Sequence, residues 1–480
     1  MRRAKIVATL GPALDDRDKL RAALEAGIDV VRLNFSHGSH ADHARRLEQV
    51  RELCVRLGRN VGALADLQGP KIRLGRLPAE GVALPSGGEV LLRPGLAELG
   101  SYGSEATPAL PVVYDALARD VQPGALVLID DGSIRLVVSR VDRDGEGVWA
   151  RIVVGGTAKS QKGINLPGVD VSAPSLTEKD LADLKVAVDL GVDWVALSFV
   201  RTPADMHDAR ARITALGGDC PIVAKLERPE VLDRLEDIVT ASDAVMVARG
   251  DLGVEIGPER VPAIQKEIIS LANAQARPVI TATEMLESMI SSPRATRAEA
   301  SDVANAIFDG TDAVMLSGET AAGRYPVEAV RTMARIIEVA ESSPHLVHPT
   351  PPSDSHEIGR VVARAACQVA RDVAAAALVV FSISGGSIQL VSKYRPAVPM
   401  IGLSPRDDTR RRTALMWGTE AALVPMKDQA AQLTTVAERV LVDGNWARRG
   451  DTIVIVSGVP GGQGGTNRIL VHRIGELVAA

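Results

Sequence analysis

Two carboxylates and one lysine near the middle of the chain have the types and spacing of a metal site that acts on an anion. Lys225 and Glu227 alternate along the extended segment PIVAKLE, so their side chains leave the same side of it. Asp251 closes the next apolar segment, DAVMVARGD. Carboxylate oxygens suit Mg²⁺ or Mn²⁺, and a neighbouring ammonium would share the charge that develops on an anionic substrate. The alternative is a salt-bridged structural cluster.

A second polar group follows the segment DVVRLN near the beginning of the chain. Its members are Arg32, Asn34, Ser36 and His37. A planar guanidinium favours phosphate or carboxylate, and the small side chains offer oxygen ligands. Taken alone, Arg32 could equally pair with a structural aspartate.

Each of these polar groups closes a short apolar run, and eight such runs occur in the chain. They are KIVATLGP, DVVRLNFSH, GALADLQG, DWVALSFVR, PIVAKLE, DAVMVARGD, PVITATE and DAVMLSGE. Near-continuous apolar runs favour parallel strands that are buried on both faces. Helix-length amphipathic stretches separate most of them, which predicts a (β/α)8 TIM barrel. Because such barrels carry their chemistry at the carboxyl ends of the strands, the pattern predicts an enzyme.

Two further units interrupt or follow the predicted barrel, which we assign to residues 1–67 and 163–343. Residues 68–162 contain short alternating strands broken by Gly and Pro, which predicts an inserted small all-β domain. It would lie at the catalytic face, where it could act as a lid or be passive decoration. After a Pro- and Ser-rich linker, residues 355–480 predict a C-terminal α/β domain with an open, mostly parallel sheet.

Composition narrows the classes of partner. The net charge is -5, which gives no general attraction to nucleic acid or to an anionic membrane. No run of about 20 apolar residues is present to span a bilayer, and Met1 leads directly into an expected strand, so we expect no signal peptide. The three cysteines are widely spaced, which favours a reducing compartment and a cytoplasmic location.

Taken together, ten segments resemble the pyruvate kinase family, in the family's order and over nearly the whole chain. The segments are KIVATLGP, RLNFSHG, ADLQGPKIRLG, QKGINLPG, ALSFVR, AKLE, MVARGDLGVE, ATEMLESM, PRATRAEASDVANA and MLSGET. The resemblance implies transfer of the phosphoryl group of phosphoenolpyruvate to ADP, giving pyruvate and ATP in the last step of glycolysis. It also implies Mg²⁺ or Mn²⁺ as cofactor and a homotetramer, in which the helix containing Ala298, Ala300, Ser301 and Ala304 contacts a partner.

The resemblance also implies a role for each polar group. Glu227 and Asp251 would hold the divalent ion, and Lys225 would stabilise the transferring phosphoryl group and the enolate. The implied catalytic residues are Lys225, Arg32, Thr283 and Ser317. The implied substrate ligands are Arg32, Lys225, Gly250, Asp251 and Thr283. The implied nucleotide ligands are Asn34, Arg73 and Lys162.

One departure from the family concerns potassium. Many members hold K⁺ with residues that match Asn34, Ser36, Asp66 and Leu67. Where those members carry a glutamate, this chain has Lys71. The chain therefore resembles the K⁺-independent branch, in which a tethered ammonium would replace the ion. The alternative is that Lys71 is a solvated hinge residue.

Two other positions leave alternatives open. Glu284 stands where the family usually has Gln, and it could raise local proton affinity or pair with Arg294 or Arg297. In the C-terminal unit, SISGGS after an expected strand could bind a phosphorylated effector through backbone amides and hydroxyls. The candidates are Ser382, Ser384, Gly385, Gly386 and Ser387. The matching place in the family binds sugar-phosphate effectors, but this turn and the last loop lack the cation of some members, so a monophosphate such as AMP or glucose 6-phosphate is at least as plausible as fructose bisphosphate. A plain tight turn is the alternative.

Rival functions of other classes remain at this stage. A Mg²⁺-dependent barrel aldolase or phosphoenolpyruvate mutase would also use paired carboxylates and an enolate, but it would need no nucleotide-covering lid. A catalytically silent metabolite sensor could share the scaffold, although the retained Lys225, Glu227, Asp251 and Thr283 favour an active enzyme.

Overall fold

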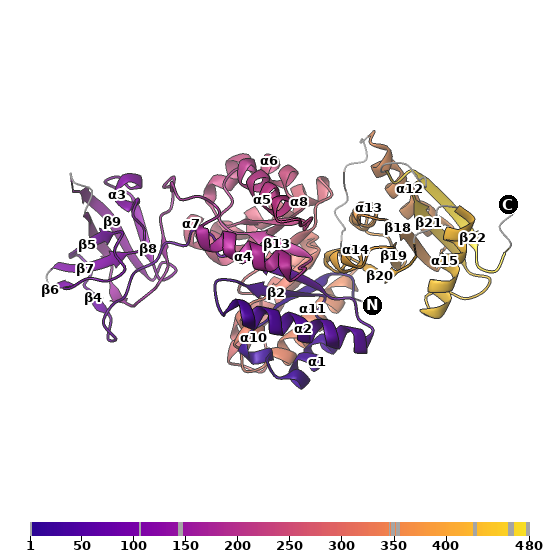
Figure 1. The fold of residues 1–480 in the computed structure, drawn as a ribbon, viewed down its shortest axis with the longest axis horizontal. Coiled ribbons are helices and arrows are strands. Elements are labelled where there is room, and N and C mark those ends of the chain that lie inside the picture. Colours follow the sequence, from indigo (N-terminus) through magenta and orange to yellow (C-terminus); the bar gives the residue numbers. More distant parts are fainter. Residues whose placement is uncertain are drawn as a thin grey trace.

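The computed structural model describes residues 2–104, 107–142, 147–344, 346, 351, 356–425, 430–458 and 465–476. Figure 1 shows three parts in a row, with a β-rich unit at one end, a barrel in the middle and an α/β unit at the other end. Within the described ranges, no helix is both long enough and apolar enough to cross a bilayer.

All eight predicted barrel strands are present, and the parallel (β/α)8 prediction is confirmed. They close in the order β1-β17-β16-β15-β14-β13-β3-β2. The strands are mainly apolar, with charged residues such as Arg32, Asp66 and Lys225 towards their carboxyl ends, and are almost entirely buried, as expected for strands covered on both faces. Their bounds are β1 Lys5–Thr9, β2 Val30–Asn34, β3 Gly62–Asp66, β13 Trp194–Leu197, β14 Ile222–Leu226, β15 Ala244–Ala248, β16 Val279–Ala282 and β17 Ala313–Leu316.

Helices surround the barrel, and several begin at a capping box just after a loop. The Ser39, Thr177 and Thr296 side chains each accept from the backbone N–H three residues ahead, where an acidic residue reciprocates. The outer helices are α1 Arg17–Ala26, α2 His40–Leu57, α4 Glu178–Asp189, α5 Pro203–Ala215, α6 Leu235–Ala241, α8 Val261–Ala274, α9 Arg297–Asp309 and α11 Pro326–Glu341. Two short helices, α7 Arg249–Ile256 and α10 Gly318–Ala321, start directly at strand ends, so their first turns lie at the catalytic face.

The β-rich unit enters after β3 and returns before α4, as predicted for an insertion. Its main sheet has the order β12-β8-β9-β10-β5-β7-β6, and β4 pairs with β11. The strands are β4 Val82–Leu84, β5 Glu89–Pro94, β6 Gly103–Ser104, β7 Thr107–Val112, β8 Leu126–Ile129, β9 Ile134–Val141, β10 Val148–Val154, β11 Gly156–Ala158 and β12 Ile164–Asn165, with helix α3 Leu117–Asp120. We call this unit the lid. Its two connections to the barrel pair with each other, because the Ile164 N–H donates to the Ile72 carbonyl at 2.9 Å.

The C-terminal unit is an open sheet of order β20-β19-β18-β21-β22, in which only the β21–β22 pair is antiparallel. This confirms the mostly parallel α/β prediction. Its elements are α12 Ile358–Asp372, β18 Ala377–Phe381, α13 Gly386–Lys393, β19 Met400–Ser404, α14 Asp407–Arg412, β20 Thr419–Leu423, α15 Ala430–Asp443, β21 Thr452–Ser457 and β22 Arg468–Arg473. Much of the predicted linker between α11 and α12 lies outside the described residues.

The C-terminal unit closes the end of the barrel opposite the lid. Ala414 and Leu415, from the 3-10 turn Thr413–Leu415, belong to the same buried cluster as inward-facing barrel residues such as Val7 and Leu64. The barrel core is therefore completed by a segment that lies far away in the sequence.

Candidate active site

Four charged side chains meet at the carboxyl ends of β2, β3 and β14. Lys225 Nζ lies 2.7 Å from Glu227 Oε1 and 3.3 Å from Asp66 Oδ1. Arg32 Nε donates to Asp66 Oδ2 at 2.6 Å, and the other oxygen of Asp66 faces the lysine. The Lys225 ammonium also donates to the Ser198 hydroxyl at 2.7 Å. The alternating pair predicted from PIVAKLE thus shares one side of the strand end with an arginine and an aspartate.

Burial and mutual attraction set the charge states of this cluster. Burial alone would lower the pKa of Lys225, but the Asp66 and Glu227 carboxylates outweigh it and raise that pKa, so the lysine remains an ammonium. Burial would raise the pKa of Asp66, yet Lys225 and Arg32 hold it below its usual value. Burial raises the pKa of Glu227 despite the adjacent Lys225. Of Asp66 and Glu227, Glu227 is therefore the carboxylate at which burial outweighs the attraction of the neighbouring cations.

The second predicted metal ligand, Asp251, lies in the first turn of α7 at the end of β15. Asp251 lines a small cavity together with Phe199, whose backbone N–H donates to Glu227 Oε2 at 3.0 Å, and the Asp251 carboxylate adds to the rise in the pKa of Glu227. In the part of the chain that the structure describes, the Asp251 side chain has no hydrogen bond or ion pair. The carboxylates of Glu227, which is paired with Lys225, and of Asp251, which has no such partner in the described ranges, would suit a hard divalent cation, with water or substrate oxygens completing its ligands.

A strained turn follows β16 and carries Thr283. Thr283 and Glu284 both have left-handed backbone angles, φ 69° and 55°. This conformation is a clear outlier for a β-branched residue, and such strain persists only where surrounding contacts hold it. Arg249 supplies those contacts by donating to the Thr283 carbonyl at 2.8 Å and to the Ala282 carbonyl at 3.3 Å. The turn directs the Thr283 hydroxyl to the Gly250 N–H at 2.7 Å, next to Asp251.

Ser317 lies at the end of β17, as predicted. Its backbone N–H donates to Glu319 Oε2 at 2.7 Å, and Glu319 is fully buried. The Ser317 hydroxyl is buried and lacks a hydrogen-bond partner among the described residues. A buried hydroxyl of this kind is costly unless a ligand or water completes it.

The predicted nucleotide ligands come from two places. Arg73 and Lys162 lie on the paired hinge segments of the lid, since Arg73 bridges to Gly163. Arg73 donates to the Gln161 carbonyl at 2.9 Å, and Lys162 pairs with Asp130 at 2.8 Å, with both charged groups of that pair about two-fifths exposed. Asn34 lies at the end of β2, and its side-chain oxygen accepts from the Ser36 N–H at 3.2 Å.

Lys71 lies on the same hinge. No ion pair joins it to Asp66 among the described residues, because Asp66 is already paired with Arg32 and Lys225. Lys71 instead lines a small cavity of about 30 Å³ together with Asp251, and its Cε would lie 3.3 Å from a Cβ built on Gly163. Its ammonium is thus available at the mouth of the site.

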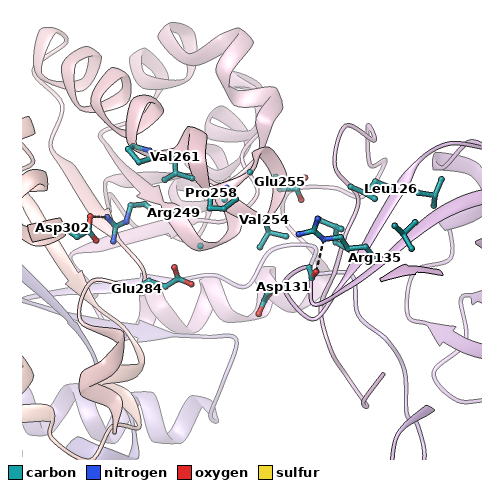
Figure 2. A pocket seen from close by; sticks show the side chains of 18 residues that line it. Leu126, Asp131, Arg135, Arg249, Val254, Glu255, Pro258, Val261, Glu284 and Asp302 are labelled. Carbon is teal, nitrogen blue, oxygen red and sulfur yellow. Dashed lines mark hydrogen bonds and ion pairs between the residues drawn. The ribbon is translucent and has the colours of Figure 1, made fainter. Parts of the chain in front are cut away.

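A larger cavity of about 750 Å³ separates the lid from the barrel. Figure 2 shows Arg135 and Leu126 of the lid facing Val254 and Pro258 of the barrel across it. Glu284 points into this cavity, and no ion pair joins it to Arg294 or Arg297 in the described structure. Of the two alternatives for this position, the salt bridge is absent.

The effector candidates form the turn between β18 and α13. Gly385 has a left-handed φ of 91°, and its N–H donates to the Ser382 hydroxyl at 3.0 Å. Ser384 and Gly386 are exposed, and the Ser387 hydroxyl accepts from Thr466 at 2.8 Å. Most of the glycine-rich loop before Thr466 lies outside the described residues.

Three more side chains belong to the site. From the sequence they are recognisable only as residues at or just after strand ends. The Thr9 hydroxyl accepts from Arg32 Nη1 at 2.9 Å, and Ser198 links Lys225 to the Leu67 carbonyl. His37 lies close enough to cations that, after burial, Arg73 and Lys71 lower its pKa. Their position after the apolar runs was the available signal, since the top of a TIM barrel collects such residues.

Sequence comparisons agree with this geometry. The family descriptions "Pyruvate kinase, barrel domain" and "Pyruvate kinase, alpha/beta domain" match residues 1–330 and 360–472. A pyruvate kinase of Mycobacterium intracellulare is 47% identical over 477 residues, covering 99% of each chain. That of Corynebacterium glutamicum is 44% identical over 483 residues, covering 99% of this chain and 98% of its own.

A solved structure agrees as well. The crystal structure of a pyruvate kinase from Cryptosporidium parvum superposes with a TM-score of 0.90 at 33% identity, covering 98% of this chain and 96% of that one. These matches favour a phosphotransferase over the aldolase and mutase alternatives. The ordered strand-end motifs, the barrel with its inserted lid and the near full-length similarity place this chain in the pyruvate kinase family.

Proposed function

We propose that this protein transfers the phosphoryl group of phosphoenolpyruvate to ADP, giving pyruvate and ATP, with the strand-end cluster as its catalytic centre. The observation that carries the assignment is the Lys225 ammonium held between Glu227 and Asp66, beside Arg32. Asp251, at the next strand end, has no ion pair among the described residues. Phosphoryl transfer needs little covalent chemistry from a protein and depends on positioning and charge neutralisation, which this cluster can supply.

Each residue has a distinct part in this proposal. Glu227 and Asp251 hold Mg²⁺ or Mn²⁺, which when bound would neutralise charge on the transferring group. Arg32, fixed by Asp66, grips the substrate phosphate, and Lys225 stabilises the phosphoryl group as it leaves the enol oxygen for the β-phosphate of ADP. The Gly250 and Asp251 backbone N–H groups donate to the substrate carboxylate. Asn34, Arg73 and Lys162 would contact the nucleotide.

The enolate left behind must gain a proton on carbon to become pyruvate. Thr283 and Ser317 are the proposed groups on that face, with the Ser317 hydroxyl acting through water. Two features support this: the strained turn at Thr283, and the Ser317 hydroxyl, which is buried without a hydrogen-bond partner in the described ranges. Both are costly and suit a site completed by substrate.

A coupled assay for pyruvate formation from phosphoenolpyruvate and ADP tests the proposal. We expect turnover that requires Mg²⁺ or Mn²⁺. Glu227→Gln and Asp251→Asn should each abolish it and raise the metal requirement, because each removes a charged ligand. No ADP-dependent pyruvate from the native protein, with or without K⁺, would leave the silent sensor as the better assignment.

We further propose that activity does not require K⁺. Lys71 supports this because its stem approaches the site from the hinge and its ammonium shares a cavity with Asp251. The Lys71 ammonium would then take the place of K⁺ at the pocket formed by Asn34, Ser36, Asp66 and Leu67.

We also propose a homotetramer with two kinds of two-fold contact. One contact would use α9, where Ala298, Ser301, Asn305 and Phe308 are exposed along one face and Phe308 is 37% exposed. The other would use the C-terminal unit, whose edge strand β22 exposes Leu470 and Val471. A monomeric mass by light scattering at micromolar concentration would contradict this.

Regulation and location complete the proposal. The turn Ser382–Ser387 would bind a phosphorylated metabolite. Activation by AMP and by glucose 6-phosphate, compared between the native protein and Ser384→Ala, tests this.

A cytoplasmic location is supported by Cys54, Cys220 and Cys367, which are buried free thiols. We keep the division into 1–67 with 163–343, 68–162 and 355–480 as the proposed domain limits.

A further inference from the structure

A buried ion pair lies next to the proposed metal site. It joins a neighbour of Glu227 to a neighbour of Asp251. Arg228 directly follows Glu227, and Glu255 lies four residues after Asp251 on α7, so it shares a helix face with Asp251. Arg228 Nη1 lies 3.1 Å from Glu255 Oε1. Their side chains are 7% and 1% exposed, so the pair is sealed from solvent.

The same pair grips the lid. Asn165, the last residue of lid strand β12, donates from its side chain to Glu255 Oε1 at 3.0 Å. Arg228 Nη2 donates to the Val169 carbonyl at 3.1 Å, and Val169 belongs to the hydrophobic core of the lid. β12 pairs with β8, so a displacement of Asn165 moves the main sheet of the lid. We call Arg228, Glu255 and Asn165 the hinge clamp.

This arrangement connects two sites through stiff elements. An ion bridging Glu227 and Asp251 would fix the end of β14 relative to the first turn of α7. Because Arg228 and Glu255 are carried by those same elements, the geometry of their pair, and with it the position of Asn165, would be fixed too. Buried ion pairs tolerate little displacement, since a lost partner leaves an uncompensated charge.

We propose that Arg228 and Glu255 are positioning residues that couple occupation of the metal site to the orientation of the lid. The inference rests on the proposed function, because it requires a divalent ion at Glu227 and Asp251. Thermodynamic linkage makes the coupling reciprocal: if the ion shifts the lid, the lid contact strengthens ion binding by the same factor. Neither Arg228 nor Glu255 needs to touch substrate.

The test measures lid position and ion affinity without catalysis. Fluorescent dyes placed at Glu80→Cys in the lid and Val55→Cys on α2 report their separation by energy transfer; Val55 is 84% exposed, and the native cysteines are buried. Titration with Mg²⁺ gives the lid response, and electron paramagnetic resonance of free Mn²⁺ gives the ion affinity.

We expect Mg²⁺ to change energy transfer in the native protein. Asn165→Leu removes the clamp from the lid side and Glu255→Leu from the barrel side; both should abolish the response and weaken Mn²⁺ binding at least about fivefold. Glu230→Gln is the matched control, because Glu230 bonds the same guanidinium at 2.8 Å but not the lid. It should keep both readouts within about twofold of native.

The outcomes separate the two proposals. A native-sized lid response in either clamp variant, or none in the native protein that still binds Mn²⁺, would overturn the coupling alone. No Mn²⁺ binding by the native protein would overturn the proposed metal site and, with it, the proposed function.

Discussion

At the carboxyl ends of the barrel strands, the Asp251 carboxylate and the Ser317 hydroxyl have no hydrogen-bond partner within the described residues. At the opposite end, both oxygens of Asp312 are occupied. Asp312 Oδ1 accepts from Arg395 at 2.8 Å, and Oδ2 accepts from Lys393 and from the Val279 N–H at 2.7 Å. The two ends use the same residue types, but the Asp251 carboxylate is open to a ligand whereas both oxygens of Asp312 are paired. Beside Asp312, Arg395 Nε is buried without a hydrogen-bond partner among the described residues.

Left-handed backbone occurs at both ends, because Arg395, which pairs with Asp312, has a φ of 49°. The catalytic end holds Thr283 and Glu284 in left-handed conformations, whereas the opposite end is closed by Ala414 and Leu415 in a packed apolar cluster. A barrel can therefore leave polar groups open to a ligand at one end while packing at the other end contributes stability. Substitutions at the two ends should accordingly change different measurements.

The largest expected effect on activity comes from Lys225→Met. It removes the ammonium between Asp66 and Glu227, so kcat should fall at least ~10³-fold, the scale of removing a preorganised transition-state charge. Phosphoenolpyruvate binding should be largely spared, because Arg32 keeps its Asp66 contact. Steady-state kinetics and a substrate titration followed by fluorescence measure the two quantities. A kcat near the native value would show that Lys225 is structural.

The matching change at the other end is Asp312→Asn. It leaves Lys393 and Arg395 buried without their carboxylate, so unfolding should cost about 3–5 kcal/mol less. Urea unfolding monitored by tryptophan fluorescence measures this, since Trp417 packs against Arg395 with the guanidinium carbon 4.7 Å from its ring centre. Near 25 °C, kcat should stay within about threefold of native, a change of less than 1 kcal/mol.

The double variant Asp312→Leu with Lys393→Met sharpens this result. It removes a carboxylate and one cation together, so it should recover part of the lost stability. If Asp312→Asn were as stable as the native protein but inactive, the two ends of the barrel would not divide function and stability as we argue.

Acid should act on the same junction. The cations Lys393 and Arg395 outweigh burial and hold the pKa of Asp312 below its usual value. A lowered folded pKa contributes stability above the unfolded pKa of about 3.9, and this contribution is lost as pH falls through the folded value. The stability advantage of the native protein over Asp312→Asn should therefore be constant near neutrality and shrink below about pH 4. Urea midpoints of both proteins from pH 3 to pH 7 check this.

The sequence predicts the catalytic end better than the opposite one. Polar residues that close apolar runs identify Arg32, Lys225 and Asp251, because strand direction alone brings such ends together. Asp312 pairs with Lys393 and Arg395, which lie 81 and 83 residues further along the chain. No local sequence pattern predicts a contact between positions so far apart.

The strained turn is hidden for a different reason. A β-branched residue such as threonine disfavours a left-handed backbone, so its conformational preference predicts a negative φ, whereas Thr283 has a φ of 69°. The Arg249 side chain and the Gly250 N–H, both from the preceding strand end, hold the turn in place. Short edge pieces of the lid such as β6 and β11 lack a run long enough to be recognised from sequence.

A smaller effect is expected from Arg249→Met. Without the guanidinium, the turn at Thr283 should relax and displace its hydroxyl from Gly250, lowering kcat about 10- to 100-fold, or roughly 1.4–2.7 kcal/mol. The control is Asp302→Asn, which removes the partner 2.7 Å from Arg249 Nη1 but leaves the carbonyl contacts, and should cost less. In a Thr283→Ala background the Arg249 change should add little, because both act on one group. Additive losses would mean that Arg249 acts elsewhere.

The smallest expected effect is that of K⁺ on the native protein. Asp66 already shares its charge with Arg32 and Lys225, and Lys71 is available on the hinge beside Asp251. A tethered ammonium has no concentration dependence, so added K⁺ should change kcat/KM less than about threefold, under 1 kcal/mol. Initial rates in tetramethylammonium buffer with and without KCl measure this.

Lys71→Glu separates a tethered charge from a solvated hinge residue. It reverses the charge at the site mouth, so activity should fall sharply in K⁺-free buffer, and KCl but not tetramethylammonium chloride should restore part of it. Arg76→Glu is the matched control, because Arg76 is an exposed cation further along the same hinge segment, and it should leave the K⁺ response unchanged. Strong activation of the native protein by K⁺, with Na⁺ and tetramethylammonium inert, would mean that the pocket at Asn34 and Asp66 binds the ion itself. The catalytic end would then need K⁺ in addition to the divalent ion, and Lys71 would be a solvated hinge residue without a role in catalysis.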